Sequence, residues 1–185
     1  MSFKLKKIVL FVLLSANVSA AAGSDHLYVG GNLLVGHNTE LDAGFASIDE
    51  SNDLGAGVFG GYSFAVHPNV DLGVELEYQH FGEAEFAENV SVEGNAFYIN
   101  ARPKFMEKGN NLYSALILGV GTLQGETNIL GASESDSKFS YQAGLEVGYM
   151  FNDIDVSVGY RYRAAEFDGV DLEIQGVTVG MRYNF

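Results

Sequence analysis

The sequence has 185 residues, with 10 Lys+Arg against 24 Asp+Glu for a net charge of −14, and it contains 23 glycines, two prolines and no cysteine. This length suggests a single domain, and the acidic balance excludes a nucleic-acid binder, which needs a basic surface. The absence of cysteine excludes disulfides, thiolate metal sites, a cysteine nucleophile and a lipoprotein anchor.

Residues 1–22 have the pattern of a secretory signal peptide. Three lysines lie within the first seven residues, an apolar run follows, and small residues continue to Ala22. The apolar run is too short to span a bilayer as a helix, and cleavage is expected after Ala20 or Ala22. Cleavage would remove three lysines and no acid, so residues 23–185 would carry a net charge of −17.

The rest of the chain alternates apolar and polar residues with a period of two, which is typical of β-strands. In the clearest segment, Leu145 and Val147 alternate with Gly144, Glu146 and Gly148. We predict eight strands, each about the length that crosses a membrane when tilted. Their ranges are 26–36, 54–64, 70–81, 96–105, 112–123, 139–149, 154–164 and 177–185.

The predicted connections alternate in length. Those at 65–69, 106–111 and 151–153 are short and contain turn residues such as Pro68, Gly109 and Asn152. The others are longer, at 37–53, 82–94, 124–137 and 165–171. Short turns at one end and longer loops at the other are typical of an outer-membrane barrel.

Three observations favour lipid on the apolar face of these strands. The polar face is rich in small residues beside full charges, which suits the narrow interior of an eight-stranded barrel. Aromatic residues gather at the short-turn end of the apolar face, as in a membrane girdle: Tyr62, Phe64, Phe105, Tyr149, Phe151, Tyr183 and Phe185. The predicted signal peptide precedes the strands. We therefore predict an all-β, eight-stranded antiparallel up-and-down transmembrane β-barrel over 23–185, with a soluble barrel such as a lipocalin as the alternative.

Strand parity directs most of the remaining basic residues into the barrel, together with several carboxylates. The predicted interior charges are Glu75, Glu77, Arg102, Lys104, Glu146, Arg161, Arg163 and Arg182, with Asp71 and Asp155 near the rim. Charges in so narrow a space must be paired or hydrated. Arginine–carboxylate pairs hold their register well, which favours a static plug of ion pairs over a gated ion path.

The four longer connections are strongly acidic. They contain 15 acids: Glu40, Asp42, Asp49, Glu50, Asp53, Glu83, Glu85, Glu88, Glu93, Glu126, Glu134, Asp136, Glu166, Asp168 and Asp171. The simplest interpretation is a solvated, repulsive cell surface. Divalent cations bridging to lipopolysaccharide, or a basic host ligand, are the functional alternatives.

No catalytic, cofactor or metal site is predicted. His80 could meet Glu83 and a serine such as Ser133 or Ser135 near the outer rim, in the manner of a lipid-modifying enzyme, but no motif fixes those distances. We interpret His80 as an interfacial or surface histidine, and we expect no enzymatic activity.

Two stretches resemble known outer-membrane barrels. Residues 54–64 (LGAGVFGGYSF), continued by Glu75-Leu-Glu-Tyr78, resemble the second and third strands of the OmpA transmembrane domain. The closing 177–185 (VTVGMRYNF) resembles the C-terminal signature of this class, whose final aromatic residue is recognised by the barrel assembly machinery. The wider pattern resembles the OmpX/Ail group of eight-stranded barrels.

The resemblance implies an integral outer-membrane protein with extracellular loops and periplasmic termini, in contact with lipid and lipopolysaccharide. It implies that Tyr183 and Phe185 belong to the assembly signal, that Glu75 and Arg102 are interior, and that Ser157 replaces an interior arginine. The expected role is structural or adhesin-like, through the acidic loops. A narrow gated pore is the alternative, and a lipid-modifying enzyme is a further one.

Overall fold

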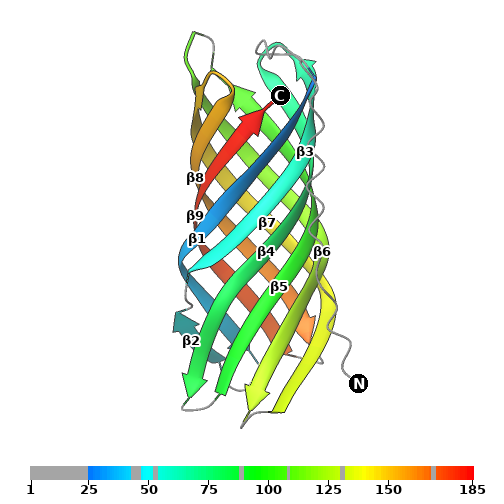
Figure 1. Cartoon of the computed structure of the whole chain (residues 1–185), viewed down its shortest axis with the longest axis vertical. Coiled ribbons are helices and arrows are strands. Elements are labelled where there is room, and N and C mark those ends of the chain that lie inside the picture. The colour runs from blue at the N-terminus through cyan, green and yellow to red at the C-terminus, as the bar shows by residue number, and fades with distance from the viewer. Residues whose placement is uncertain are drawn as a thin grey trace, which may run out of the picture.

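The computed structural model is a tall barrel of strongly tilted antiparallel strands (Figure 1). The structure describes residues 25–42, 47–51, 54–87, 90–107, 109–129, 132–167 and 170–185. Within these ranges, side chains are not described for 37–53, 83–93, 126–136 and 166–171. The predicted signal peptide, residues 1–22, lies outside the described residues.

Each strand pairs with its neighbours in chain order, and the first strand also pairs with the last. The strands are β1 (His26–Asp42), β2 (Ser47–Ser51), β3 (Gly55–His67), β4 (Val70–Ala87), β5 (Val90–Met106), β6 (Leu112–Ile129), β7 (Ala132–Phe151), β8 (Ile154–Phe167) and β9 (Val170–Asn184). Leu33 of β1 lies opposite Ala56 of β3 on one side and Val179 of β9 on the other, which closes the barrel.

The barrel has eight strand positions, because β2 and β3 pair with successive stretches of β1 and together form one side of its wall. The predicted eight-stranded antiparallel up-and-down barrel is therefore confirmed. In the described part of the chain, no helix is long and apolar enough to cross a membrane.

The two ends of the barrel differ in their connections. The turns β3–β4, β5–β6 and β7–β8 share one end with the C-terminus, at the top of Figure 1, and we call it the turn end. Gly109 and Asn152 take left-handed backbone angles there, with φ of 75° and 53°, as tight turns require. The opposite end, where β2 lies, is the loop end.

The strands continue further toward the loop end than predicted. Most of 37–53, 82–94, 124–137 and 165–171, which were expected to be loops, belongs to strands in the structure. Ladder pairs such as Glu85–Ser91 and Thr127–Glu134 join these extensions. The hydrogen-bond ladder of a hairpin can continue in water, whereas alternating hydrophobicity marks only the part that contacts lipid. The prediction therefore ended each strand where the apolar face ends.

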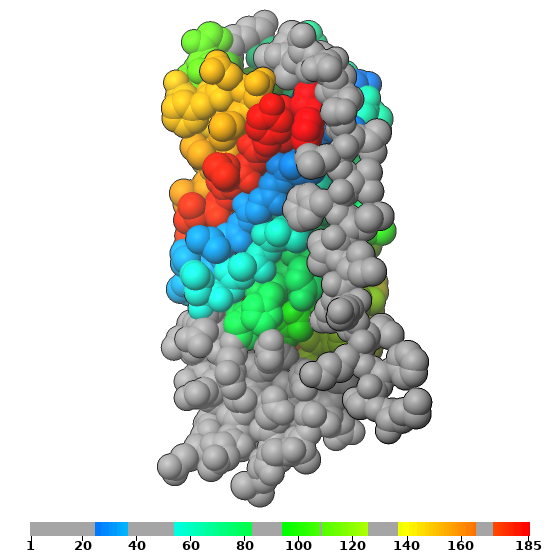
Figure 2. Space-filling view, viewed as in Figure 1, coloured from blue at the N-terminus to red at the C-terminus, as the bar shows by residue number. Residues whose placement is uncertain are grey.

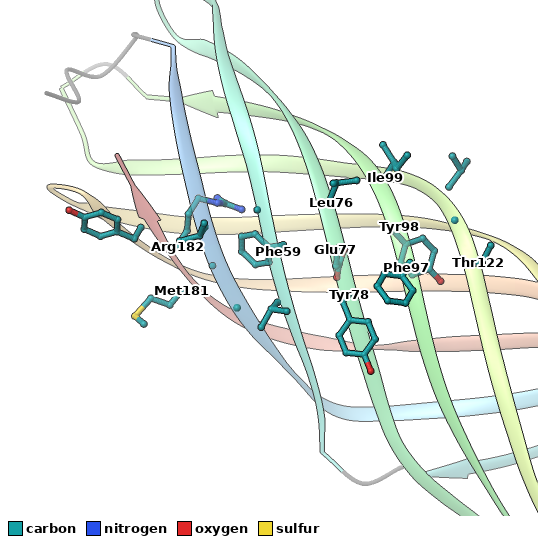
Figure 3. Close-up of a pocket in the computed structure, with 18 of the residues that line it drawn as sticks. Phe59, Leu76, Glu77, Tyr78, Phe97, Tyr98, Ile99, Thr122, Met181 and Arg182 are labelled. Atoms are coloured by element: carbon teal, nitrogen blue, oxygen red, sulfur yellow. The ribbon is translucent and has the colours of Figure 1, made fainter. Parts of the chain in front are cut away.

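The apolar face of the wall is exposed, as predicted. Leu76 of β4 is 65% exposed, whereas its neighbour Glu77 is 2% exposed. Figure 3 shows part of this wall, with Leu76 and Ile99 from the exposed set and Glu77 and Tyr98 from the buried set. In Figure 2, β9, β1, β3 and β4 form tilted bands side by side across the visible surface. A soluble barrel would bury this apolar face.

Aromatic side chains border the exposed apolar band on both sides. Toward the turn end the exposed rings include Tyr62, Phe64, Phe105, Tyr149, Phe151 and Tyr183, as predicted. A second group toward the loop end comprises Tyr78, Phe97, Phe139, Tyr141 and Tyr160. On β7, Phe139 and Tyr149 are ten residues apart. At about 3.4 Å per residue and a tilt of about 40°, that separation is about 26 Å along the barrel axis, close to the height of a membrane band.

Candidate functional site

The interior of the barrel contains ten buried charged side chains among the described residues. Five are acidic and five are basic, so their formal charges cancel. They are Asp71, Glu75, Glu77, Glu146 and Asp155, with Arg102, Lys104, Arg161, Arg163 and Arg182. All eight predicted interior charges are in this set. Because buried charge is costly unless it is paired, their detailed geometry decides what the interior can do.

Glu77 of β4 is the centre of the first cluster. Its carboxylate lies 3.2 Å from both Arg161 and Arg163 of β8, which reach it from across the interior. It also accepts hydrogen bonds from three amides, which are Asn100 of β5 (2.7 Å), Gln142 of β7 (2.8 Å) and Asn32 of β1 (3.5 Å). One carboxylate on β4 therefore binds side chains from four other strands, β1, β5, β7 and β8.

A second cluster lies toward the turn end. Glu146 of β7 accepts hydrogen bonds from Arg102 of β5 and from the Tyr113 hydroxyl of β6, the latter at 3.0 Å. Lys104 donates to Asp155 of β8 at 2.9 Å, and its ammonium group lies 4.5 Å from the centre of the Tyr113 ring. Both basic side chains of β5 are thus paired with carboxylates on other strands.

Arg182 of β9 lies between the carboxylates and is bound closely by none of them. Its guanidinium is 3.5 Å from Glu75, 3.8 Å from Asp155 and 3.9 Å from Glu146. The same group lies 4.7 Å from the centre of the Tyr28 ring, which provides a cation–π contact. Arg182 is therefore a cation shared by Glu75 and the second cluster, and Glu75 accepts a hydrogen bond from Asn100 of the first cluster at 3.0 Å.

Glycines on the inner wall make room for aromatic rings. A Cβ on Gly148 would lie 2.3 Å from the ring of Tyr113, and one on Gly61 or Gly73 would lie 2.6 or 2.7 Å from the Tyr28 hydroxyl. Real Cβ atoms do not approach other atoms so closely, so larger residues would displace these tyrosines. The small residues of the polar face are thus part of the packing of the interior.

An apolar cluster fills the interior on the loop side of the charges. It comprises Leu34, Phe81, Ala96, Tyr98, Leu123, Ala165, Leu172 and Ile174. Arg163 connects the two layers, because its guanidinium lies 5.2 Å from the centre of the Phe81 ring. The sequence reasoning did not identify this cluster. The signal was strand parity, which directs Phe81, Ala96 and Leu123 inward although each is apolar.

Several guanidinium nitrogens have no hydrogen-bond partner among the described residues. Arg102 and Arg161 each have one such nitrogen, their Nε. Arg163 and Arg182 each have two, Nε and Nη1. One carboxylate oxygen of Asp71 is also without a partner. The arginines are thus neutralised by nearby carboxylates without full hydrogen bonding.

The other predicted residues lie as follows. Glu75 and Arg102 are both interior, but Arg102 is bound to Glu146, and Ser157 is half-buried. At the end of β9, the rings of Tyr183 and Phe185 are 5.0 Å apart.

The histidine considered for catalysis lies on the wall near the loop end. His80 Nδ1 is 3.0 Å from Oδ1 of Asn95. The side chains of Glu83, Ser133 and Ser135, its suggested partners, lie outside the described residues, as do those of the 15 acids. Within the described ranges no group of three or more His, Asp or Glu side chains could hold a metal ion.

The fold is shared with known outer-membrane barrels. The structure is similar to Neisserial surface protein A, with 14% sequence identity and a TM-score of 0.61 over 86% of this chain and 97% of that one. It is also similar to Ail of Yersinia pestis, with 17% identity and a TM-score of 0.58 over 89% of this chain and 100% of that one. The N-terminal β-barrel domain of Pseudomonas aeruginosa OprF gives 12% identity and a TM-score of 0.53 over 88% and 100%.

A search of curated protein sequences gives no significant match. The family comparison is decisive, because residues 8–185 match the family described as outer membrane protein beta-barrel domain. The chain therefore belongs to the outer membrane protein β-barrel domain family and is an outer-membrane protein of the eight-stranded type.

Proposed function

We propose that the protein is a closed, non-conducting barrel that supports the outer membrane and interacts with surface ligands through its loop end. The observation that carries this proposal is the filled interior. A neutral set of ten charges occupies the side toward the turn end, and the apolar cluster occupies the side toward the loop end. An ion would have to leave water and pass Leu34, Phe81 and Leu123, which are at most 1% exposed.

The proposed orientation places the loop end outside the cell and the turn end, with both mature termini, in the periplasm. Short periplasmic turns are the rule for bacterial outer-membrane barrels. The strand order brings the four acid-rich segments to the loop end. An acidic surface favours a basic ligand or bridging divalent cations. Ail of Yersinia pestis has been crystallised with the heparin analogue sucrose octasulfate, an anion that would be repelled here.

Planar-bilayer recording tests closure. We expect the wild-type barrel to give no steady conductance at any voltage. Phe81→Gly, which opens the apolar cluster, should admit small currents if this cluster is the barrier. As a control, each variant should migrate on a gel without boiling at the position of the folded wild-type barrel, which verifies that the inserted protein is folded. Steady wild-type currents that Glu75→Ala or Arg161→Ala alters would contradict a closed interior.

A narrow pore is the second candidate, and one observation favours it. Arg182 has no carboxylate closer than 3.5 Å, and two of its nitrogens have no hydrogen-bond partner among the described residues. A loosely held cation of this kind could move under an applied voltage. The bilayer recording decides between the two candidates, because the pore requires current through the wild-type protein.

Ligand class can be tested on cells that express the protein. We expect adhesion to polylysine-coated surfaces that weakens with added salt, and little adhesion to heparin-coated ones. Preference for heparin would contradict a basic ligand.

The proposed role includes no catalysis, so lipid A mass spectra should not change when the protein is deleted or overexpressed. A new lipid A species would overturn the proposal that the protein is not an enzyme.

A further inference from the structure

Two outward-facing tyrosines share one hydrogen-bonding pattern, and a third lies in the matching position. Each of the two hydroxyls bonds to a polar side chain on the next strand, two residues nearer the loop end than the residue paired with that tyrosine. The bonds join Tyr78 to Asn95 (2.8 Å) and Tyr160 to Gln175 (2.8 Å), and Glu173 lies at the same offset from Tyr162. The rings therefore lie toward the apolar band, and their polar tips point toward the loop end.

The Tyr160–Gln175 pair and the neighbouring Tyr162 and Glu173 form, together with Tyr141, a continuous patch on β7, β8 and β9, which we call the tyrosine patch. It comprises Tyr141, Tyr160, Tyr162, Glu173 and Gln175. The rings of Tyr141 and Tyr162 have their centres 6.5 Å apart and are tilted by 47°. Tyr141 is 50% exposed and Tyr160 is 47% exposed, so both rings are accessible from outside the barrel.

The tyrosine patch continues the lipid-facing surface at its boundary. Tyr160 is paired with Leu145 on one side and Val177 on the other, both of which belong to the exposed apolar band. Tyr141 is eight residues from Tyr149 of the turn-end girdle. This is about 21 Å along the barrel axis, which places the patch where hydrocarbon ends and headgroups begin.

The chemistry of the tyrosine patch selects the part of a lipid that it can bind. Aromatic rings offer flat faces, and the Glu173 carboxylate and Gln175 carboxamide accept hydrogen bonds. Among the described outward residues of β7–β9 there is no Lys, Arg or His, and Glu173 would repel a phosphate. The complementary partner is a neutral group with several hydroxyl donors and an apolar ring face, which describes a sugar.

We propose that the tyrosine patch binds the sugar headgroup of an outer-leaflet glycolipid through the sugar hydroxyls rather than through phosphates. The inference rests on the orientation proposed above, which places the loop end in the outer leaflet. The patch then determines the depth of the barrel and gathers glycolipid on the β7–β9 side.

The test compares three lipids added to the purified barrel in detergent micelles. The probes are deep-rough lipopolysaccharide, the same lipid after removal of its phosphates, and phosphatidylglycerol, and binding is followed by tyrosine fluorescence because the chain has no tryptophan. The wild type should bind the first two with affinities within about twofold of each other, and phosphatidylglycerol about tenfold more weakly.

Two variants and a control separate the contributions. The ring variant Tyr160→Leu/Tyr162→Leu and the acceptor variant Glu173→Leu/Gln175→Leu should each bind both glycolipids about tenfold more weakly. Leucine suits a lipid-facing position, so both should retain the folded gel band. The control Tyr149→Phe, in the turn-end girdle, should bind as the wild type does.

Three results would overturn the proposal: wild-type affinity in both variants, loss of binding when phosphates are removed, or equal binding of phosphatidylglycerol. Binding in micelles does not depend on orientation in the cell. Protease access to the loop end on intact cells tests the orientation separately, so the failure of one is distinguishable from the failure of the other.

Discussion

Replacing Glu77 by glutamine should destabilise the barrel more than any other neutralisation of an interior carboxylate. The substitution preserves shape but removes the charge that lies 3.2 Å from both Arg161 and Arg163, whose side chains are 4% and 0% exposed. Two guanidiniums would then remain buried with no carboxylate of the described side chains within ion-pair distance. Removing one partner of a buried ion pair costs about 3–5 kcal/mol in the free energy of unfolding.

The donors around Glu77 add to this cost. Asn100 and Gln142 both donate to its Oε2, at 2.7 and 2.8 Å, and Arg161 donates to the same atom. If the Nε2 of the substituted side chain took the position of Oε2, its N–H groups would point at three other donors and could accept no hydrogen bond from them. If the amide group rotated by 180°, Nε2 would instead point at the guanidinium of Arg163. We therefore expect a loss of about 4 kcal/mol in the free energy of unfolding.

Glu75→Gln is the matched control. Glu75 has one cation, Arg182, at 3.5 Å, and Arg182 keeps two other carboxylates within 4 Å. The Glu75→Gln substitution should lower the free energy of unfolding by about 1–2 kcal/mol. Urea unfolding in phosphatidylcholine vesicles, followed by the unboiled gel band and by far-UV circular dichroism, measures both variants.

A double variant tests the electrostatic reasoning directly. Arg163→Met added to Glu77→Gln restores charge balance and places an apolar side chain against Phe81, so we expect it to recover at least about 1 kcal/mol. A Glu77→Gln loss no larger than that of Glu75→Gln, together with no recovery in the double variant, would refute the central role of Glu77.

Three further predictions concern the packing, the lipid face and assembly. Gly148→Ala should cost about 1–3 kcal/mol of unfolding free energy because its Cβ would lie 2.3 Å from the Tyr113 ring; Gly60→Ala, where the nearest atom is 3.7 Å away, should change the urea midpoint little. Leu76→Arg, in the exposed apolar band, should lower the free energy of unfolding by about 2–4 kcal/mol, as measured by reversible folding into lipid vesicles. No change in this free energy would argue against lipid at this face. Deleting Phe185 should slow barrel assembly in cells while unassisted folding in detergent stays unchanged; equal slowing in both assays would identify it as a packing residue only.

The membrane part of the fold could be predicted from alternation because alternate residues of each strand contact two different environments. Leu76 faces outward and Glu77 inward, and the prediction had both correctly placed. The same reasoning failed at the loop end. The structure begins β7 at Ala132, seven residues before the predicted start at Phe139. In that stretch both faces are polar, so the ladder continues without a hydrophobic signal.

The composition of the interior was also predictable, but its pairing was not. Parity directs Glu77, Arg161 and Arg163 inward, yet β4 and β8 are not neighbours in the sheet. Which charges meet across the barrel depends on the stagger accumulated over all the strands between them, and no local pattern records it. The inward apolar residues near the loop end were missed for a different reason, since apolar residues were assigned to lipid by default.

The distribution of charge follows from these positions. The ten buried charged residues cancel, so the entire net charge of −14 lies on residues outside that set. Closure and surface charge are thus physically separate. Neutralising the acids of the loop end should leave the interior ion pairs, and the stability that they provide, intact. Altering Glu77 should leave the surface charge intact. If the loop end binds a basic ligand, the two groups of variants should affect separate properties, ligand binding in one and unfolding in the other. Substitutions at the loop end that opened the barrel would show that the acids help to hold the interior closed.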